Sequence, residues 1–156
     1  LILGLASNSK VMLFDEPSTG LDANNRYKFY KLLMEKMEEE EKYCVISTHI
    51  IDEAENVFEK VLILENKKLI LDEEVPSIQE KALTISGSRD LILEILKNKN
   101  VIDSKTIGGM KIISIYDDLT DEERIDLKAR NAEIQSIPLQ DLFVLLTEKE
   151  EGNESY

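Results

Sequence analysis

The sequence is poor in cysteine and in basic residues. Cys44 is the only cysteine among 156 residues, so the chain cannot form an internal disulfide. Its neighbours in Tyr43-Cys44-Val45-Ile46 predict a buried, unreactive thiol, which fits a reducing compartment. Lysine and arginine number 19 against 32 aspartates and glutamates, which gives a net charge of −13. So acidic a chain lacks the basic face that a nucleic acid or an anionic membrane surface requires.

Long apolar runs are also absent. No run approaches the ~18–20 residues that a helix needs to cross a membrane. The apolar content of 42% is nevertheless enough for a packed core, in a length that allows one ordinary domain or one and a half small ones. Because the chain opens on Leu1 within an apolar pattern, we expect it to be a piece of a longer protein.

The most informative stretch is an apolar run that ends at two adjacent carboxylates. Val11-Met12-Leu13-Phe14 leads directly into Asp15-Glu16, and Pro17 and Gly20 follow. The uninterrupted run predicts a strand buried on both faces, as in the centre of a parallel sheet. Open α/β sheets bind ligands at the carboxyl ends of their strands, so the carboxylates are placed for a metal-and-water site. By themselves, the two acids could equally be a solvated strand end.

A helix and a second strand follow. Residues 23–41 carry an apolar stripe between lysines and glutamates, which predicts a helix. Residues 42–47 are typical of a buried strand and end just before His49. A strand, a long helix and a strand predict a right-handed parallel crossover, which brings His49 and the two carboxylates to one sheet edge. We expect another short helix over residues 51–58.

The rest of the chain predicts a hairpin and a second unit. Residues 60–65 and 68–72 are two strands joined around Asn66-Lys67. The charged, proline-bearing residues 73–77 are the expected boundary. Beyond it we expect strands at 82–86, 101–107, 110–116 and 132–137, and helices at 89–99, 120–131 and 139–147. Four strands with two helices between them indicate an α+β sandwich of ferredoxin-like type.

Two segments resemble motifs of a known family. Asp15-Glu16-Pro17-Ser18-Thr19-Gly20-Leu21-Asp22 is similar, nearly letter for letter, to the Walker B motif and D-loop of ATP-binding-cassette (ABC) ATPases. Ser47-Thr48-His49 resembles the switch histidine of this family at the family's spacing. In this family, residues 1–6 would end the helix that follows the signature motif. Residues 136–147 resemble, less specifically, the closing helix of exporter-type ABC ATPases.

The resemblance implies a role for each matching residue. Asp15 would be the Mg²⁺ partner, and Glu16 would be the catalytic residue that orients or deprotonates the attacking water. His49 would contact the γ-phosphate of ATP. The D-loop residues, which would reach the partner subunit, are Ser18, Gly20, Leu21 and Asp22. From the residues alone, His49 could be a structural histidine, and Ser18 or Asp22 could be turn residues.

The implied protein is the ATP-hydrolysing subunit of an ABC transporter of the exporter type. Its fold would be α/β, with part of a P-loop NTPase parallel sheet over residues 1–77. A small ferredoxin-like α+β unit over 78–148 and a disordered tail over 149–156 would follow. The expected partners are ATP with Mg²⁺, membrane-spanning permease subunits and a second nucleotide-binding subunit in a head-to-tail dimer. The protein would lie on the inner face of the cell membrane.

Several motifs of that family are missing from the sequence. It contains no G-x-x-x-x-G-K-[ST] loop, no Q-loop and no LSGGQ-like signature, and Gly108-Gly109 lacks the lysine of a phosphate-binding loop. We therefore expect this chain to be inactive by itself. Two other functions stay open: a soluble ABC ATPase that acts on ribosomes or DNA, which the acidic charge disfavours, and an interaction or dimerisation module from residue 78 onward.

Overall fold

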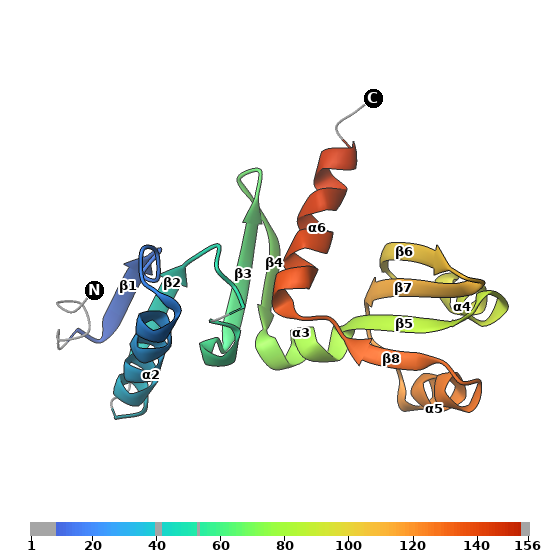
Figure 1. The fold of residues 1–156 in the computed structure, drawn as a ribbon, viewed down its shortest axis with the longest axis horizontal. Coiled ribbons are helices and arrows are strands. Elements are labelled where there is room, and N and C mark those ends of the chain that lie inside the picture. Colours follow the sequence, from blue (N-terminus) through green and yellow to red (C-terminus); the bar gives the residue numbers. More distant parts are fainter. Residues whose placement is uncertain (1–8, 40–41, 53, 154–156) are drawn as a thin grey trace. The chain divides into compact units, whose positions relative to one another are not determined.

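The computed structural model describes residues 9–39, 42–52 and 54–153. It divides into two compact units, Leu1–Phe58 and Glu59–Tyr156, which we describe separately (Figure 1). The helix end expected at residues 1–6 lies outside the described residues. Within the described ranges, no helix is both long and apolar enough to span a membrane.

The first unit is a strand–helix–strand motif. Strands β1 (Val11–Asp15) and β2 (Tyr43–Ser47) pair in parallel, as the sequence predicts, and α2 (Ala23–Glu39) connects them. The apolar stripe of α2 packs on one face of this sheet. The buried cluster consists of Met12, Phe29, Tyr30, Leu33 and Ala54.

Strand β1 is not buried on both faces, contrary to the prediction. Met12 is 4% exposed, whereas Leu13 is 74% exposed and Val11 is 53% exposed. Successive side chains of a strand point to opposite faces. Among the described residues of this unit, α2 and its neighbours cover only the Met12 face, so the apolar residues on the other face lie exposed.

The prediction of a helix over residues 51–58 is also wrong. The described part of this segment contains only a short 3₁₀ helix, η1 (Glu55–Val57). The N–H groups of Ala54 and Glu55 both donate to the carbonyl of Ile51, which makes a single turn. Phe58 already has an extended backbone, with φ −84° and ψ 133°, and β3 begins two residues later, so a longer helix has no room.

The second unit opens with the predicted hairpin. Strands β3 (Lys60–Glu65) and β4 (Lys68–Glu74) pair in antiparallel fashion around Asn66 and Lys67. Both turn residues have positive φ, 48° and 62°, as a two-residue type I′ turn requires. The two units divide at Phe58–Glu59 and not near residue 77, so this hairpin belongs to the second unit.

Residues 73–77, the boundary that the sequence predicts, have regular secondary structure. Glu73 and Glu74 end β4, and α3 (Val75–Lys81) begins at once, with its proline in the first turn, where the missing N–H costs nothing. Ser77 Oγ donates to Glu73 at 2.5 Å, and Lys81 Nζ donates to the same carboxylate at 2.9 Å. These bonds fix the junction between strand and helix.

A four-stranded antiparallel sheet forms the rest of the unit, in the order β6-β7-β5-β8. Its strands are β5 (Ala82–Ser88), β6 (Val101–Ile107), β7 (Met110–Tyr116) and β8 (Glu133–Ser136), and its helices are α4 (Arg89–Leu96), α5 (Asp121–Ala129) and α6 (Leu139–Asn153). Leu83, Ile85, Ile113 and Ile115 of the sheet share one core with Leu91 and Ile92 of α4 and Leu127 of α5. Both helices therefore cover the same face of the sheet.

The last helix is longer than the sequence predicts. It continues to Asn153, so residues 149–153 are helical rather than a disordered tail, and residues 154–156 lie outside the described part. Residues 148–151 read Glu-Lys-Glu-Glu. These straight-chain residues have high helix propensity and contain no breaker, so they extend the apolar helix before them.

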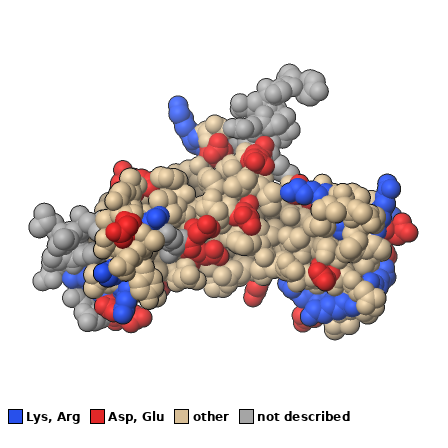
Figure 2. All heavy atoms as spheres, in the orientation of Figure 1, with Lys and Arg blue, Asp and Glu red and all other residues tan. Residues whose placement is uncertain are grey.

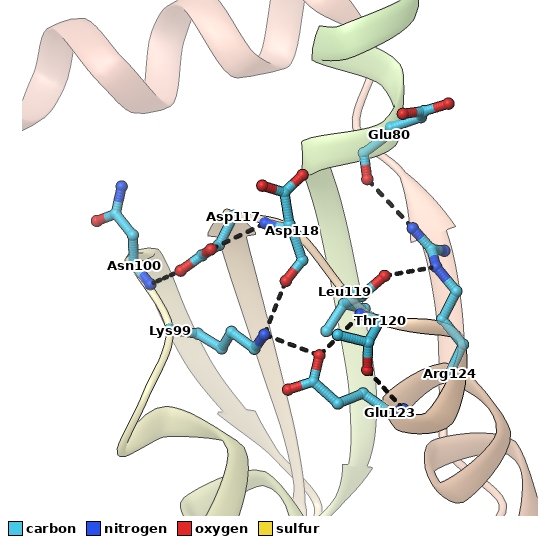
Figure 3. A network of polar contacts seen from close by, with 9 residues as sticks. All are labelled: Glu80, Lys99, Asn100, Asp117, Asp118, Leu119, Thr120, Glu123 and Arg124. Atoms are coloured by element: carbon cyan, nitrogen blue, oxygen red, sulfur yellow. Dashed lines mark hydrogen bonds and ion pairs between the residues drawn. The ribbon is translucent and has the colours of Figure 1, made fainter.

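A polar network joins the start of α5 to the loop before β6 (Figure 3). Thr120 and Glu123 form a capping box, in which each side chain bonds to the other residue's N–H. The side chain of Lys99 is 12% exposed, and its Nζ donates to Glu123 at 2.8 Å and to the Asp118 carbonyl at 2.7 Å. Lys99 holds the pKa of Glu123 below its usual value, and the Thr120 N–H adds to this effect.

Candidate functional site

The parallel register brings the polar ends of β1 and β2 together. Asp15 lies opposite Ser47, and Ser47 Oγ donates to Asp15 Oδ1 at 2.8 Å. The Glu16 N–H donates to the Ser47 carbonyl at 2.8 Å, which extends the pairing by one residue. The two strand ends are thus tied by a backbone bond and a side-chain bond.

Glu16 is the centre of the site. Its Oε1 lies 2.8 Å from His49 Nδ1 and accepts the His49 N–H at 3.2 Å. Its Oε2 accepts longer bonds from Thr48 Oγ1 at 3.4 Å and from Thr19 Oγ1 at 3.5 Å. Groups from both strand ends and from the following loop therefore hold one carboxylate.

The backbone of Glu16 is strained. Its φ is 44°, a left-handed conformation that costs a residue with a Cβ about 1–3 kcal/mol. This φ turns the chain at the end of β1, so that Asp15 bonds to Ser47 while Glu16 bonds to His49. Strain of this kind persists only where the surroundings fix it, and it is concentrated at functional sites.

The loop after Glu16 is a compact turn. The Thr19 N–H donates to the Glu16 carbonyl and the Leu21 N–H to the Ser18 carbonyl, both at 3.1 Å. Gly20 has φ 79°, a conformation that glycine adopts without strain. Ser18 is 1% exposed, and its buried Oγ has no hydrogen-bond partner among the described residues. Gly20 therefore allows the loop to turn, and Ser18 Oγ makes no hydrogen bond to the Glu16 carboxylate.

Asp22 has a role that needs no ligand. Its Oδ1 accepts the Asn25 N–H at 2.8 Å, and its Oδ2 accepts Asn25 Nδ2 at 3.0 Å. This is the geometry of a helix N-cap at the start of α2. The structure thus supports the simpler interpretation of Asp22, while its predicted role toward a partner subunit stays a prediction.

The site is open to solvent. The side chain of His49 is 74% exposed and that of Glu16 is 35% exposed, so a ligand can reach both. A cavity of about 450 Å³ lies elsewhere, in the second unit, where its lining includes Asp118, Leu119 and Arg124. The site of Glu16 and His49 therefore lies on exposed strand ends, and a search for the largest cavity would not find it.

Three hydroxyl residues contact the carboxylates without having been assigned a role of their own. They are Thr19, Ser47 and Thr48. Each of them is part of a motif, but the sequence predicts no contact for it. Each lies close in sequence to an assigned residue at the end of a strand, and this proximity could have predicted the contacts. Which carboxylate oxygen they meet depends on the φ of Glu16, and no sequence pattern gives that angle.

Comparison with known proteins gives a consistent result, although no family model matches the chain. It is 31% identical over 77 residues to the probable ABC transporter ATP-binding protein p29 of Mycoplasma pneumoniae, which is 49% of this chain and 32% of that protein. It is 26% identical over 141 residues to ATP-binding cassette sub-family A member 9 of Homo sapiens, which is 90% of this chain and 8% of that protein.

A third relative is the aliphatic sulfonates import ATP-binding protein SsuB 2 of Rhodococcus jostii. It is 31% identical over 83 residues, which is 53% of this chain and 34% of that protein. The chain spans about a third of the length of the two bacterial relatives and less than a tenth of the human one. These matches confirm the similarity to ABC transporter ATP-binding proteins that the motifs around Glu16 and His49 predict.

Proposed function

We propose that this chain, which contains part of an ABC nucleotide-binding domain, supplies the hydrolytic residues of an ATP site in a longer transporter protein. The observation that carries the proposal is the contact of Glu16 with His49, at 2.8 Å, on the tips of two parallel strands. Similarity to ABC transporter ATP-binding proteins supports the same function.

Glu16 is the proposed base for the attacking water. A carboxylate within hydrogen-bond reach of water can orient it and accept its proton. Oε1 of Glu16 accepts the His49 N–H and lies 2.8 Å from His49 Nδ1, whereas Oε2 accepts, among the described residues, only the two long hydroxyl bonds, at 3.4 and 3.5 Å. Oε2 is therefore the oxygen that we assign to the water.

His49 positions Glu16 and is the proposed contact for the γ-phosphate. If Nδ1–H donates to Glu16, the neutral ring has no proton on Nε2. Donation from Nε2 to the γ-phosphate would therefore need a proton on each ring nitrogen. His49 thus couples the carboxylate to the phosphate through its two ring nitrogens.

Asp15 is the proposed Mg²⁺ partner, and its surroundings fit that ion. No group of three or more potential ligand side chains occurs among the described residues, so this part of the chain has no complete metal cage. Mg²⁺ usually takes one or two carboxylates and completes its shell with waters and substrate phosphates. Bound in this way, Mg²⁺ would neutralise phosphate charge, and Ser47 would hold the Asp15 carboxylate toward it.

Partners of the intact protein follow from the family. We propose membrane-spanning permease subunits, location on the inner face of the cell membrane, and a second nucleotide-binding subunit that the loop with Ser18, Gly20 and Leu21 contacts head to tail. The net charge of −13 supports a function without nucleic acid. Figure 2 shows both acidic and basic side chains on one face of the molecule.

Export is the proposed direction of transport, and it rests on the second unit. We propose 1–77 and 78–148 as the limits of the family's domains, with a ferredoxin-like fold in the second, although the hairpin β3–β4 belongs to the second compact unit. The order β6-β7-β5-β8, with α4 and α5 in one core, supports this fold. The 141-residue match to the human sub-family A protein includes most of this unit, whereas the matches to the two bacterial proteins are 77 and 83 residues long.

Mg-ATP hydrolysis by the full-length protein tests the proposal. Glu16→Gln should lower kcat by about 10²–10⁴-fold, because the base is lost while the shape is kept. ATP binding should remain, which fluorescent-nucleotide titration measures. Unchanged hydrolysis in Glu16→Gln would contradict the proposal. The 156-residue chain by itself, which has no phosphate-binding loop, is expected to be inactive.

A further inference from the structure

Strand β6 presents an open edge of the four-stranded sheet. It is the first strand in the order β6-β7-β5-β8, and no other strand of the described residues pairs with its outer side (Figure 1). Helix α6 contacts β6 within the same unit, and residues 104–107 of the strand remain exposed. Such an edge offers a row of N–H and C=O groups to another strand. The opposite edge, β8, has only four residues, which limits pairing there.

The hairpin geometry shows which backbone groups of β6 point outward. Gly108 and Gly109 form a two-residue turn with φ 57° and 88°, and Ile107 lies opposite Met110. The residues that flank such a turn form a hydrogen-bonded pair, and the pattern then alternates along the strand. Residues 103, 105 and 107 therefore bond to β7, while Ser104 and Thr106 direct their N–H and C=O groups away from it.

Of the three registers centred on Asp103, Ser104 and Lys105, one brings opposite charges together when this edge pairs with a second copy of itself. In an antiparallel pair of two β6 strands, residues whose backbone groups point outward must lie opposite each other. Because these residues alternate along the strand, the two-fold axis must pass through a residue and not between two residues. An axis at Lys105 would put two lysines opposite each other, and an axis at Asp103 would put two aspartates opposite each other. An axis at Ser104 puts each Asp103 opposite the partner's Lys105.

The register with its axis at Ser104 also brings the side chains of Asp103 and the partner's Lys105 close together. With Ser104 in a hydrogen-bonded pair, Asp103 and the partner's Lys105 form a non-hydrogen-bonded pair, in which the side chains approach most closely. Within one chain, Lys105 Nζ already lies 3.2 Å from Asp103 Oδ2, on the same face of the strand. In the pair, four charges of alternating sign would form a square.

We propose that β6 pairs with β6 of a second copy of this chain, about a two-fold axis at Ser104, and joins two sheets into one of eight strands. The surface consists of the outward groups of Ser104 and Thr106 together with Asp103 and Lys105. It does not involve the strand tip that carries Glu16. The proposal therefore stands or fails independently of the ATPase function.

A charge-swap experiment on the 156-residue chain tests the pairing. Sedimentation equilibrium over a range of concentrations should show a monomer–dimer equilibrium. Lys105→Asp should weaken the dimer by about tenfold or more, because it makes like charges face each other twice. The double variant Asp103→Lys/Lys105→Asp should restore the dimer. Lys97→Glu, an exposed change beyond the end of α4, is the control for net charge.

A proline variant tests the backbone bonds. Ser104→Pro removes an N–H that points away from β7, a position that an edge strand tolerates. It should abolish the dimer and leave the circular dichroism spectrum unchanged. A monomer at every concentration, or a dimer that neither Lys105→Asp nor Ser104→Pro weakens, would overturn the proposal.

Discussion

Glu16 combines a strained backbone with a carboxylate that several neighbouring groups hold. Its positive φ costs free energy, and its contacts with His49, Thr48 and Thr19 hold it in that conformation. A residue held in this way keeps its oxygens in fixed positions before any ligand arrives, which is what general-base catalysis requires. The proposed chemistry therefore depends on how the neighbours of Glu16 hold this one side chain.

The sequence predicted part of this arrangement. Because parallel strands end at one edge, Asp15, Glu16 and His49 were expected together, and the bonds between Asp15 and Ser47 and between Glu16 and His49 agree with that expectation. Their catalytic roles stay predictions. The hydroxyl contacts could not be predicted, because they depend on the left-handed turn at Glu16, which a glutamate rarely adopts.

Asp22 offers a test that separates stability from partner contact. Asp22→Ala should destabilise α2 by about 1 kcal/mol, because it removes the N-cap acceptor of the Asn25 N–H. Amide hydrogen exchange in α2 measures this loss. Asp22→Asn keeps a capping oxygen and should keep wild-type protection. Equal losses in both variants would show that the charge, and not the cap, stabilises the helix.

At the scale of elements, strands and turns were predicted better than helix limits. Hairpin β3–β4 and the turn at Gly108-Gly109 follow from apolar runs broken by turn residues. Helix α3 was missed because Pro76 suggested a break, although proline is well placed in a first turn. The exposure of Leu13 was missed because burial of β1 depends on what covers its second face.

Lys67 is suboptimal in its turn. Its φ of 62° is unfavourable for a residue with a Cβ, so Lys67→Gly should stabilise the hairpin by about 0.5–1 kcal/mol after the greater entropy of unfolded glycine is subtracted. Amide exchange of β3 and β4 reports the change. Lys68→Gly, one residue later in the extended strand, should destabilise it instead. Destabilisation by Lys67→Gly would contradict the assignment of the turn.

The network at the start of α5 predicts a dependence on pH. The pKa of Glu123 is lowered in the folded chain, chiefly by the bond from Lys99. Its contribution to stability is therefore complete above the ordinary glutamate pKa of 4.5 and is lost as the pH falls through the lower, folded value. Glu123→Gln should melt at a lower temperature than wild type at neutral pH.

The difference in melting temperature between wild type and Glu123→Gln should narrow steadily below pH 4.5. Circular dichroism melts across that range measure it. Glu122→Gln, an exposed change one residue earlier on α5, should keep the wild-type slope. A difference that is constant with pH would mean that the ion pair with Lys99 contributes nothing to stability.

At the scale of the whole molecule, the chain consists of two compact units, and each carries one of the proposed sites. The first carries the strand-tip residues around Glu16, and the second carries the open edge of β6. The sequence predicted two units, but the structure divides them at Phe58–Glu59, because the hairpin β3–β4 continues directly into α3. Apolar pattern alone does not show which neighbour a hairpin packs against.

The most direct test of the account is a double-mutant cycle of Mg-ATP hydrolysis in the full-length protein. If Glu16 and His49 act as one unit, Glu16→Gln and His49→Ala should each lower kcat, and the double variant should be no slower than Glu16→Gln alone. Losses that multiply in the double variant would mean that the two residues act separately and that their 2.8 Å contact has no part in catalysis.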